Sequence, residues 1–115
     1  MKKVVLFAFN GEVMCFIHVL LNALDLKSKG YDARVVIEGA ATKLIPDLGV
    51  EGSLLNGPFK KAKAENIIDG VCRACSEKMG TSGDAGALGL NLLADMWGHP
   101  GIARYLMEGY EVITF

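Results

Sequence analysis

The sequence predicts an α/β fold in which helices cover a mostly parallel β-sheet. Short apolar runs rich in β-formers alternate along the chain with segments of helical periodicity. The apolar runs are continuous rather than alternating, as is typical of strands buried on both faces of a parallel sheet. The first two runs are joined by one helix-length segment, which is the connection that neighbouring parallel strands need.

A complete strand–helix–strand unit occupies the first forty residues. Its helix has a broad apolar stripe, which a helix buries against a sheet. Gly30 follows in the position where glycine commonly ends a helix. The unit consists of a strand at 2–9, a turn at Asn10-Gly11, a helix at 12–29 and a strand at 33–39.

The alternation continues less regularly to the end of the chain. Gly57-Pro58 indicates a helix start, because proline is tolerated in the first helical turn. Gly80 closes a two-turn helix, and residues 81–90 are expected to form a loop or a weak helix. The other expected elements are a short helix at 42–48, a helix from Pro58, strands at 67–71, 92–96 and 110–115, a helix at 73–79, and a helix from His99-Pro100 to Met107 or Glu108.

Size and composition indicate one domain that spans residues 1–115. The net charge is −1, which excludes an electrostatic footprint for nucleic acid or for an anionic membrane. The apolar run before Asn10 is too short for a signal peptide, and no stretch is long enough to span a membrane. We therefore expect a cytoplasmic protein, in which the three cysteines are thiols rather than disulfides.

Three strand ends are expected to meet at one edge of the sheet. Ligands and reactive groups of parallel α/β sheets gather beyond the carboxyl ends of the strands. Asn10 and Gly11 follow the first strand, Glu38 and Gly39 follow the second, and Cys72 follows the third. Their convergence predicts a ligand-binding or reactive site.

The motif DGVCRACSEKMG places two cysteines at this edge. Cys72 lies at a strand-to-helix junction, where unpaired N–H groups favour an anion and are expected to lower the pKa of the thiol. Cys75 follows one helical turn later, on the same side of the helix. Cys72 is interpreted as a reactive thiol or as buried filler, and Cys75 as a second reactive thiol or a packing residue.

The sequence predicts no metal site and no cofactor. A zinc site built on Cys72 and Cys75 would need two more ligands, and no second Cys-x-x-Cys or His-x-x-x-His motif is present. Cys15 and His18 lie three apart on the first helix, where packing against a neighbouring subunit is the simpler interpretation. The early glycines do not form a dinucleotide-binding fingerprint.

The chain resembles the DsrE/DsrF-like proteins, which include the TusD-like sulfur-transfer proteins. The resemblance runs nearly end to end and rests on FNG after the first strand, LNALDLKSKGYDARVVIEGAA, GVCRACSEKMG and the closing GIARYLMEGYEVITF. It implies a three-layer α/β sandwich around a mostly parallel sheet of about five strands. Cys72 matches the position at which family members with a functional cysteine carry sulfane sulfur as a persulfide, and Cys75 matches a second cysteine found in many of them.

The resemblance implies a sulfur carrier or sulfurtransferase with donor and acceptor proteins as partners. Two other functions remain open: a non-catalytic module that binds a small ligand or a partner's tail, and a Cys72–Cys75 dithiol that acts in redox exchange. The resemblance also implies a trimer or hexamer. The first helix independently predicts a homo-oligomer, since it is apolar over most of its circumference and the sheet can cover only one side.

Overall fold

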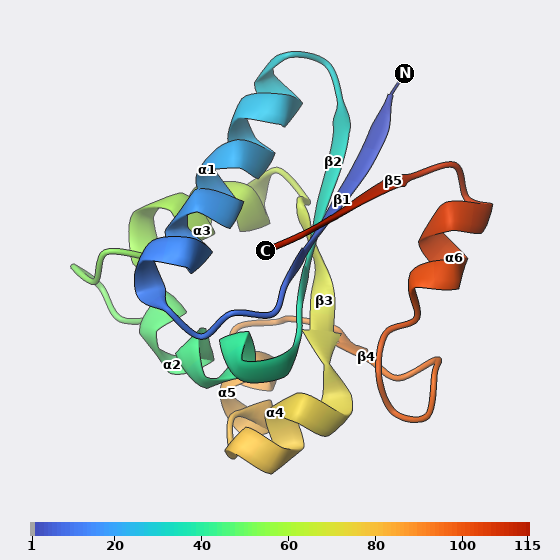
Figure 1. The fold of residues 1–115 in the computed structure, drawn as a ribbon. Coiled ribbons are helices and arrows are strands. Elements are labelled where there is room, and N and C mark those ends of the chain that lie inside the picture. Colours follow the sequence, from blue (N-terminus) through green and yellow to red (C-terminus); the bar gives the residue numbers. More distant parts are fainter. Residues whose placement is uncertain (1) are drawn as a thin grey trace.

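The computed structural model describes residues 2–115 and confirms the predicted fold class. Five parallel strands form one sheet in the order β4-β3-β2-β1-β5. The first strand therefore lies inside the sheet, and the last strand pairs with its free side (Figure 1). The strands are β1 (Lys3–Ala8), β2 (Asp32–Ile37), β3 (Ile68–Cys72), β4 (Leu92–Leu93) and β5 (Glu111–Thr114).

Helices cover both faces of the sheet, as the three-layer prediction requires. One face carries α1, α2 and α3, while α6 lies on the other, and α4 and α5 lie beyond the carboxyl end of β3 (Figure 1). The helices are α1 (Val13–Ser28), the 3-10 helix η1 (Gly39–Leu44), α2 (Ile45–Leu48), α3 (Asn56–Ala64), α4 (Arg73–Met79), α5 (Ser82–Ala87) and α6 (Ile102–Met107).

The two faces of the sheet have cores of unequal size. The larger core joins β1, β2 and β3 to α1 and α3, and Phe16, Leu20 and Phe59 are fully buried or nearly so within it. The smaller core lies under α6, where the Tyr105 ring packs edge-on against Phe7. One short helix, α6, thus covers this face of the sheet, whereas α1, α2 and α3 cover the opposite face (Figure 1).

Polar side chains tie α6 to the sheet. The Tyr105 hydroxyl donates to the Asp69 carboxylate, which also pairs with Arg34 at 3.2 Å and with Arg104 at 2.9 Å. Because Asp69 belongs to β3 and Tyr105 to α6, this network fixes the segment that leads into α6 relative to the strand that ends at Cys72.

Three elements differ from the sequence-based expectations. The fourth strand covers only Leu92–Leu93, and the weak helix after Gly80 is an ordered α5. The last helix begins at Ile102 instead of His99, because residues 96–99 close a tight turn through paired backbone hydrogen bonds. His99 therefore lies in a turn, where its side chain is not committed to a helix face. Among residues 2–115, no helix has the length and apolar character to span a membrane.

Candidate functional site

Cys72 is held at the junction between β3 and α4. It is the last residue of the strand and the residue that precedes the helix, as the sequence predicted. The backbone N–H of Cys75 donates to the Cys72 sulfur at 3.3 Å, so the thiol itself caps the helix start. The Cys72 side chain is completely buried. The local sequence thus builds a fixed sulfur position one turn away from Cys75.

A tight turn brings His99 to the two cysteines. The backbones of Met96 and His99 exchange hydrogen bonds of 2.7 and 2.9 Å, with Trp97 and Gly98 between them at positive φ. Two consecutive residues at positive φ define the mirror-image turn that suits a two-residue connection. The Gly98 carbonyl accepts the N–H of Ala74 at 3.0 Å, which fastens the turn to α4.

The imidazole of His99 contacts both thiols. Its Nδ1 atom lies 3.1 Å from the Cys72 sulfur and 3.6 Å from the Cys75 sulfur. The three atoms all lie within 4.8 Å of one another. His99 follows Cys75 by 24 residues in the sequence, so the cluster exists only in the folded chain.

A pocket of about 390 Å³ opens beside this cluster. Cys75 and His99 line it and are half-buried, whereas Cys72 lies behind them and does not reach its surface. The remaining lining residues are Gly39, Ala40, Ala74, Lys78 and Met79. A molecule in the pocket would therefore meet the Cys75 sulfur first.

The expectation that the helix start lowers the pKa of Cys72 is wrong. Burial, together with the neighbouring Cys75 thiol and the Glu38 charge, raises the pKa of Cys72 to about 12. The N–H bond from Cys75 acts in the opposite direction but is outweighed. Desolvation of a fully buried sulfur exceeds what the first turn of a seven-residue helix provides. Cys72 is therefore a neutral thiol at neutral pH.

Glu38 and Gly39 belong to this edge of the sheet, as predicted. Gly39 lines the pocket, and the charge of Glu38 contributes to the raised pKa of the Cys72 thiol. Burial raises the pKa of Glu38, and the charge of His99 opposes that rise.

Asn10 and Gly11 do not line the pocket. The Asn10 side-chain oxygen instead accepts the N–H of Glu12 at 2.8 Å, which shapes the turn into α1. Gly11 provides room for the 3-10 helix, because a Cβ atom there would lie 2.6 Å from Cε of Lys43. These two residues therefore shape the loop and are not part of the pocket wall.

Cys15 and His18 lie away from the thiol cluster, on an exposed face of α1. With Met14 and Phe115 they line a mostly apolar pocket of about 350 Å³. In the described part of the chain, the group with metal-ligand geometry is formed by Cys72, Cys75 and His99, which does not include them.

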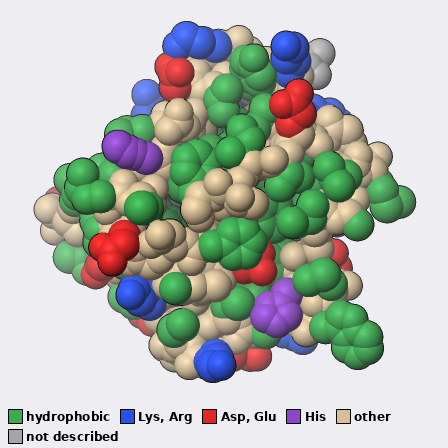
Figure 2. Space-filling model, viewed as in Figure 1, with side chains coloured by type: hydrophobic (Ala, Val, Ile, Leu, Met, Phe, Trp, Pro, Cys, Tyr) green, Lys and Arg blue, Asp and Glu red, His purple; other side chains and the backbone are tan. Residues whose placement is uncertain are grey.

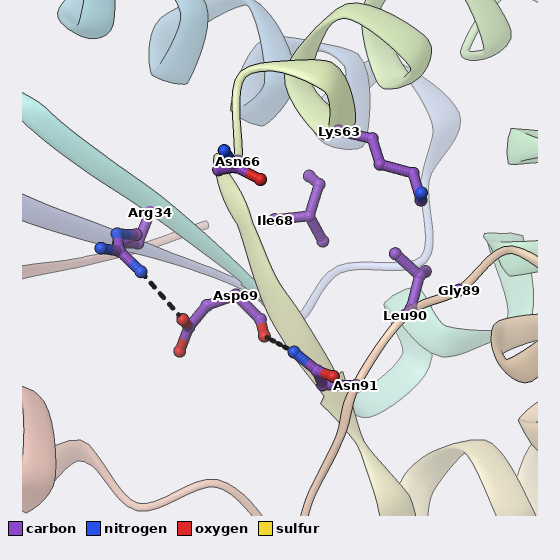
Figure 3. A pocket seen from close by; sticks show the side chains of 8 residues that line it. All are labelled: Arg34, Lys63, Asn66, Ile68, Asp69, Gly89, Leu90 and Asn91. Atoms are coloured by element: carbon purple, nitrogen blue, oxygen red, sulfur yellow. Dashed lines mark hydrogen bonds and ion pairs between the residues drawn. The ribbon is translucent and has the colours of Figure 1, made fainter.

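A further pocket, of about 270 Å³, lies at the opposite end of β3 (Figure 3). Its lining is polar, but Arg34 points to the Asp69 carboxylate, and the Asn91 amide donates to the Asp69 backbone carbonyl at 3.4 Å (Figure 3). Arg34 of β2 and Asp69 of β3 are thus paired with each other. Without a thiol or an imidazole, this pocket lacks the nucleophilic chemistry of the cysteine cluster.

Comparison with known proteins identifies relatives without an assigned activity. No protein-family model matches the chain. The uncharacterized protein MJ0733 of Methanocaldococcus jannaschii is 33% identical over 96 residues, which cover 84% of this chain and 76% of that protein. An uncharacterized protein of Archaeoglobus fulgidus is 41% identical over 59 residues, covering 51% of this chain and 95% of its own length.

One solved structure has the same fold. It is that of BT1422, a conserved protein of unknown function from Bacteroides thetaiotaomicron. The two structures superpose with a TM-score of 0.77 over 99% of this chain and 95% of the other, at 18% sequence identity. At that identity the likeness establishes the fold alone.

Proposed function

The chain belongs to the family of the archaeal protein MJ0733, and we propose that it is a DsrE/DsrF-like sulfur carrier, in which Cys75 holds sulfane sulfur as a persulfide and Cys72 can take part in its release. One observation carries this proposal: two thiols share one imidazole at the wall of a pocket. A reducing compartment such as the cytoplasm would keep both thiols available. The residue that meets the donor is Cys75 rather than Cys72, because only Cys75 lines the pocket.

In the loading step, the Cys75 sulfur attacks the outer sulfur of a donor persulfide. The imidazole of His99, 3.6 Å from that sulfur, takes the thiol proton. A new S–S bond forms on Cys75, the S–S bond of the donor breaks, and the donor leaves as a thiolate that recovers a proton. The transferred atom remains sulfane sulfur throughout, so the step needs no separate oxidant.

The transferred sulfur can leave Cys75 by two routes. An acceptor thiolate can attack the outer sulfur of the Cys75 persulfide, which restores the Cys75 thiol and leaves a persulfide on the acceptor. Alternatively, the Cys72 sulfur can attack the inner sulfur, which forms a Cys72–Cys75 disulfide and releases hydrosulfide. The second route is open because the two sulfurs lie within 4.8 Å. It oxidises the two thiols while reducing the sulfane atom.

A dithiol redox function is the second candidate. The same proximity of the two sulfurs favours it, since both are free thiols that a disulfide could join. A redox protein would cycle between dithiol and disulfide without gaining sulfur, whereas a carrier gains one sulfur atom.

Mass spectrometry after exposure to a sulfane-sulfur donor tests the proposal. The reduced protein should gain about 32 Da, one sulfur atom. Cys75→Ser should abolish the gain, whereas Cys72→Ser should retain it, and Cys15→Ser is the matched control with an exposed thiol outside the cluster. Absence of any adduct would refute the carrier function, and an adduct lost only in Cys72→Ser would reverse the roles of the two cysteines.

A homo-oligomer completes the proposal. The outer edge of β5 is unpaired in the single chain, and hydrophobic side chains gather over β5 and the neighbouring face of α1 (Figure 2). Met14, Leu21 and Ile113 are each exposed to between 44% and 64%. A second copy would cover this surface, with a trimer or hexamer expected from the family resemblance. Light scattering that gives a monomer mass at micromolar concentration would refute the oligomer.

A further inference from the structure

We propose that Cys72, Cys75 and His99 form a binding site for a zinc ion. This inference goes beyond sulfur transfer and does not depend on it. The sequence predicted no metal because further ligands were lacking near the two cysteines. The fold supplies a third ligand, since the turn at 96–99 brings the His99 imidazole to both sulfurs.

The separations of the three atoms fit one tetrahedral ion. Bond lengths of about 2.3 Å to sulfur and 2.0–2.1 Å to nitrogen place bound ligand atoms about 3.6–3.8 Å apart. The His99 nitrogen lies 3.1 and 3.6 Å from the two sulfurs, and no pair in the cluster exceeds 4.8 Å. Shifts of about an ångström or less, within side-chain adjustment, would bring all three to the ion.

The backbone around the site already has features that support bound thiolates. The Cys-x-x-Cys spacing is common among zinc ligands. The Cys75 N–H, which points at the Cys72 sulfur, would stabilise negative charge on that sulfur. The turn that carries His99 is fastened to α4 through Gly98, and the Asp95 carboxylate accepts the N–H of Gly101 at 3.3 Å on its far side. The ligand positions are therefore held from both segments.

The fourth coordination position would face the pocket. Cys75 and His99 both line its 390 Å³ volume, so a water molecule or a small soft anion could reach the ion there. Three protein ligands with one open position are typical of zinc sites that do chemistry rather than of closed structural sites. Binding forms two Zn–S bonds and one Zn–N bond and releases the two thiol protons to solvent.

Two thiolates and an imidazole select the class of metal. Soft thiolate ligands exclude magnesium and calcium, which prefer oxygen. Zinc accepts both sulfur and nitrogen without a change of oxidation state, so it requires no redox partner. These properties point to zinc among the common biological divalent ions.

Equilibrium binding to the reduced protein tests the site. The protein is titrated with Zn²⁺ against a chromophoric chelator, and bound metal is quantified after desalting. We expect one zinc per chain, with affinity at least about tenfold weaker in Cys75→Ser and in His99→Ala. Neither side chain is fully buried, so both variants should fold, which circular dichroism would verify. Cys15→Ser and His18→Ala are matched controls and should bind as the unmodified protein does.

Cobalt provides a second measurement. Co²⁺ in the same site should show thiolate-to-metal charge-transfer absorption and the visible bands of a tetrahedral centre, and both should disappear in Cys75→Ser. Absence of stoichiometric zinc, or binding that is unchanged by the cluster variants or weakened by the controls, would overturn the proposal. Sulfur loading is measured separately by mass, so failure of zinc binding leaves the carrier function standing, and the reverse also holds.

Discussion

Burial should make Cys72 a slow nucleophile. In metal-free, reduced protein we expect alkylation of Cys72 to be far slower than that of an ordinary exposed thiol. An ordinary thiol, with a pKa of about 8.5, is about one-tenth ionised at about pH 7.5. With a pKa of about 12, Cys72 is ionised to only about 3 parts in 100,000 under the same conditions.

The rate difference is smaller than the difference in ionisation. A more basic thiolate is a better nucleophile, and a Brønsted slope of about 0.4–0.5 recovers roughly 40-fold of the roughly 3,000-fold loss. The net prediction is a Cys72 rate roughly 100-fold below that of an ordinary thiol, before the slower access to a fully buried sulfur is included.

Iodoacetamide labelling with peptide mass spectrometry measures this directly. Cys15, which is exposed on α1, provides an internal reference within the same molecule. Trypsin cleaves after Arg73, between the two cysteines, so the labelling of Cys72 can be followed separately in the unmodified protein. Labelling of Cys72 within about fivefold of the Cys15 rate would refute the argument that desolvation controls this site.

Further perturbations test other parts of the structure. Glu38→Gln should change the Cys72 alkylation rate by less than about threefold, because the Glu38 charge is a weaker influence on that thiol than burial; a tenfold change would contradict this. Gly70→Ala should destabilise the fold by about 1–3 kcal/mol in urea unfolding, since the new Cβ would lie 2.6 Å from Cγ of Leu93, whereas the control Gly83→Ala meets nothing and should be neutral or stabilising. Burial and the hydrogen bond to Asp32 raise the pKa of Tyr110 to about 12, so this tyrosine's contribution to stability is complete below about pH 10 and lost as the pH rises through 12. Tyr110→Phe should therefore cost about 1 kcal/mol at neutral pH and show a shallower alkaline decline; equal slopes in the two proteins would contradict the assignment.

The fold could be predicted because its signals are local. The continuous apolar run before Asn10 and the periodic segment that follows it indicate a buried strand and a covering helix without knowledge of distant residues. The placement of Cys72 at the end of β3 was predictable for the same reason, since an apolar run stops there. The shortness of β4 was not, because its two residues are defined by pairing with Val71 and Cys72.

Only part of the site could be predicted, because His99 is brought to the two cysteines by the tertiary fold. Proline after His99 favoured a helix start. A positive φ at Trp97 closes a turn there instead, and this backbone conformation cannot be predicted from the residue type. The charge state of Cys72 also depends on burial, which no local motif reports. The backbone N–H at the helix start does act to lower the pKa of Cys72, as expected. Desolvation of the fully buried side chain raises that pKa by more.

The turn that carries His99 also contains an intrinsic fluorescent probe. Trp97 is the single tryptophan of the chain, it is 96% exposed, and it lies two residues before His99. All tryptophan fluorescence of a single chain therefore arises in the turn that carries His99. Any occupant that shifts the turn or excludes water from it should change the emission, so occupancy of the site can be followed continuously in unlabelled protein.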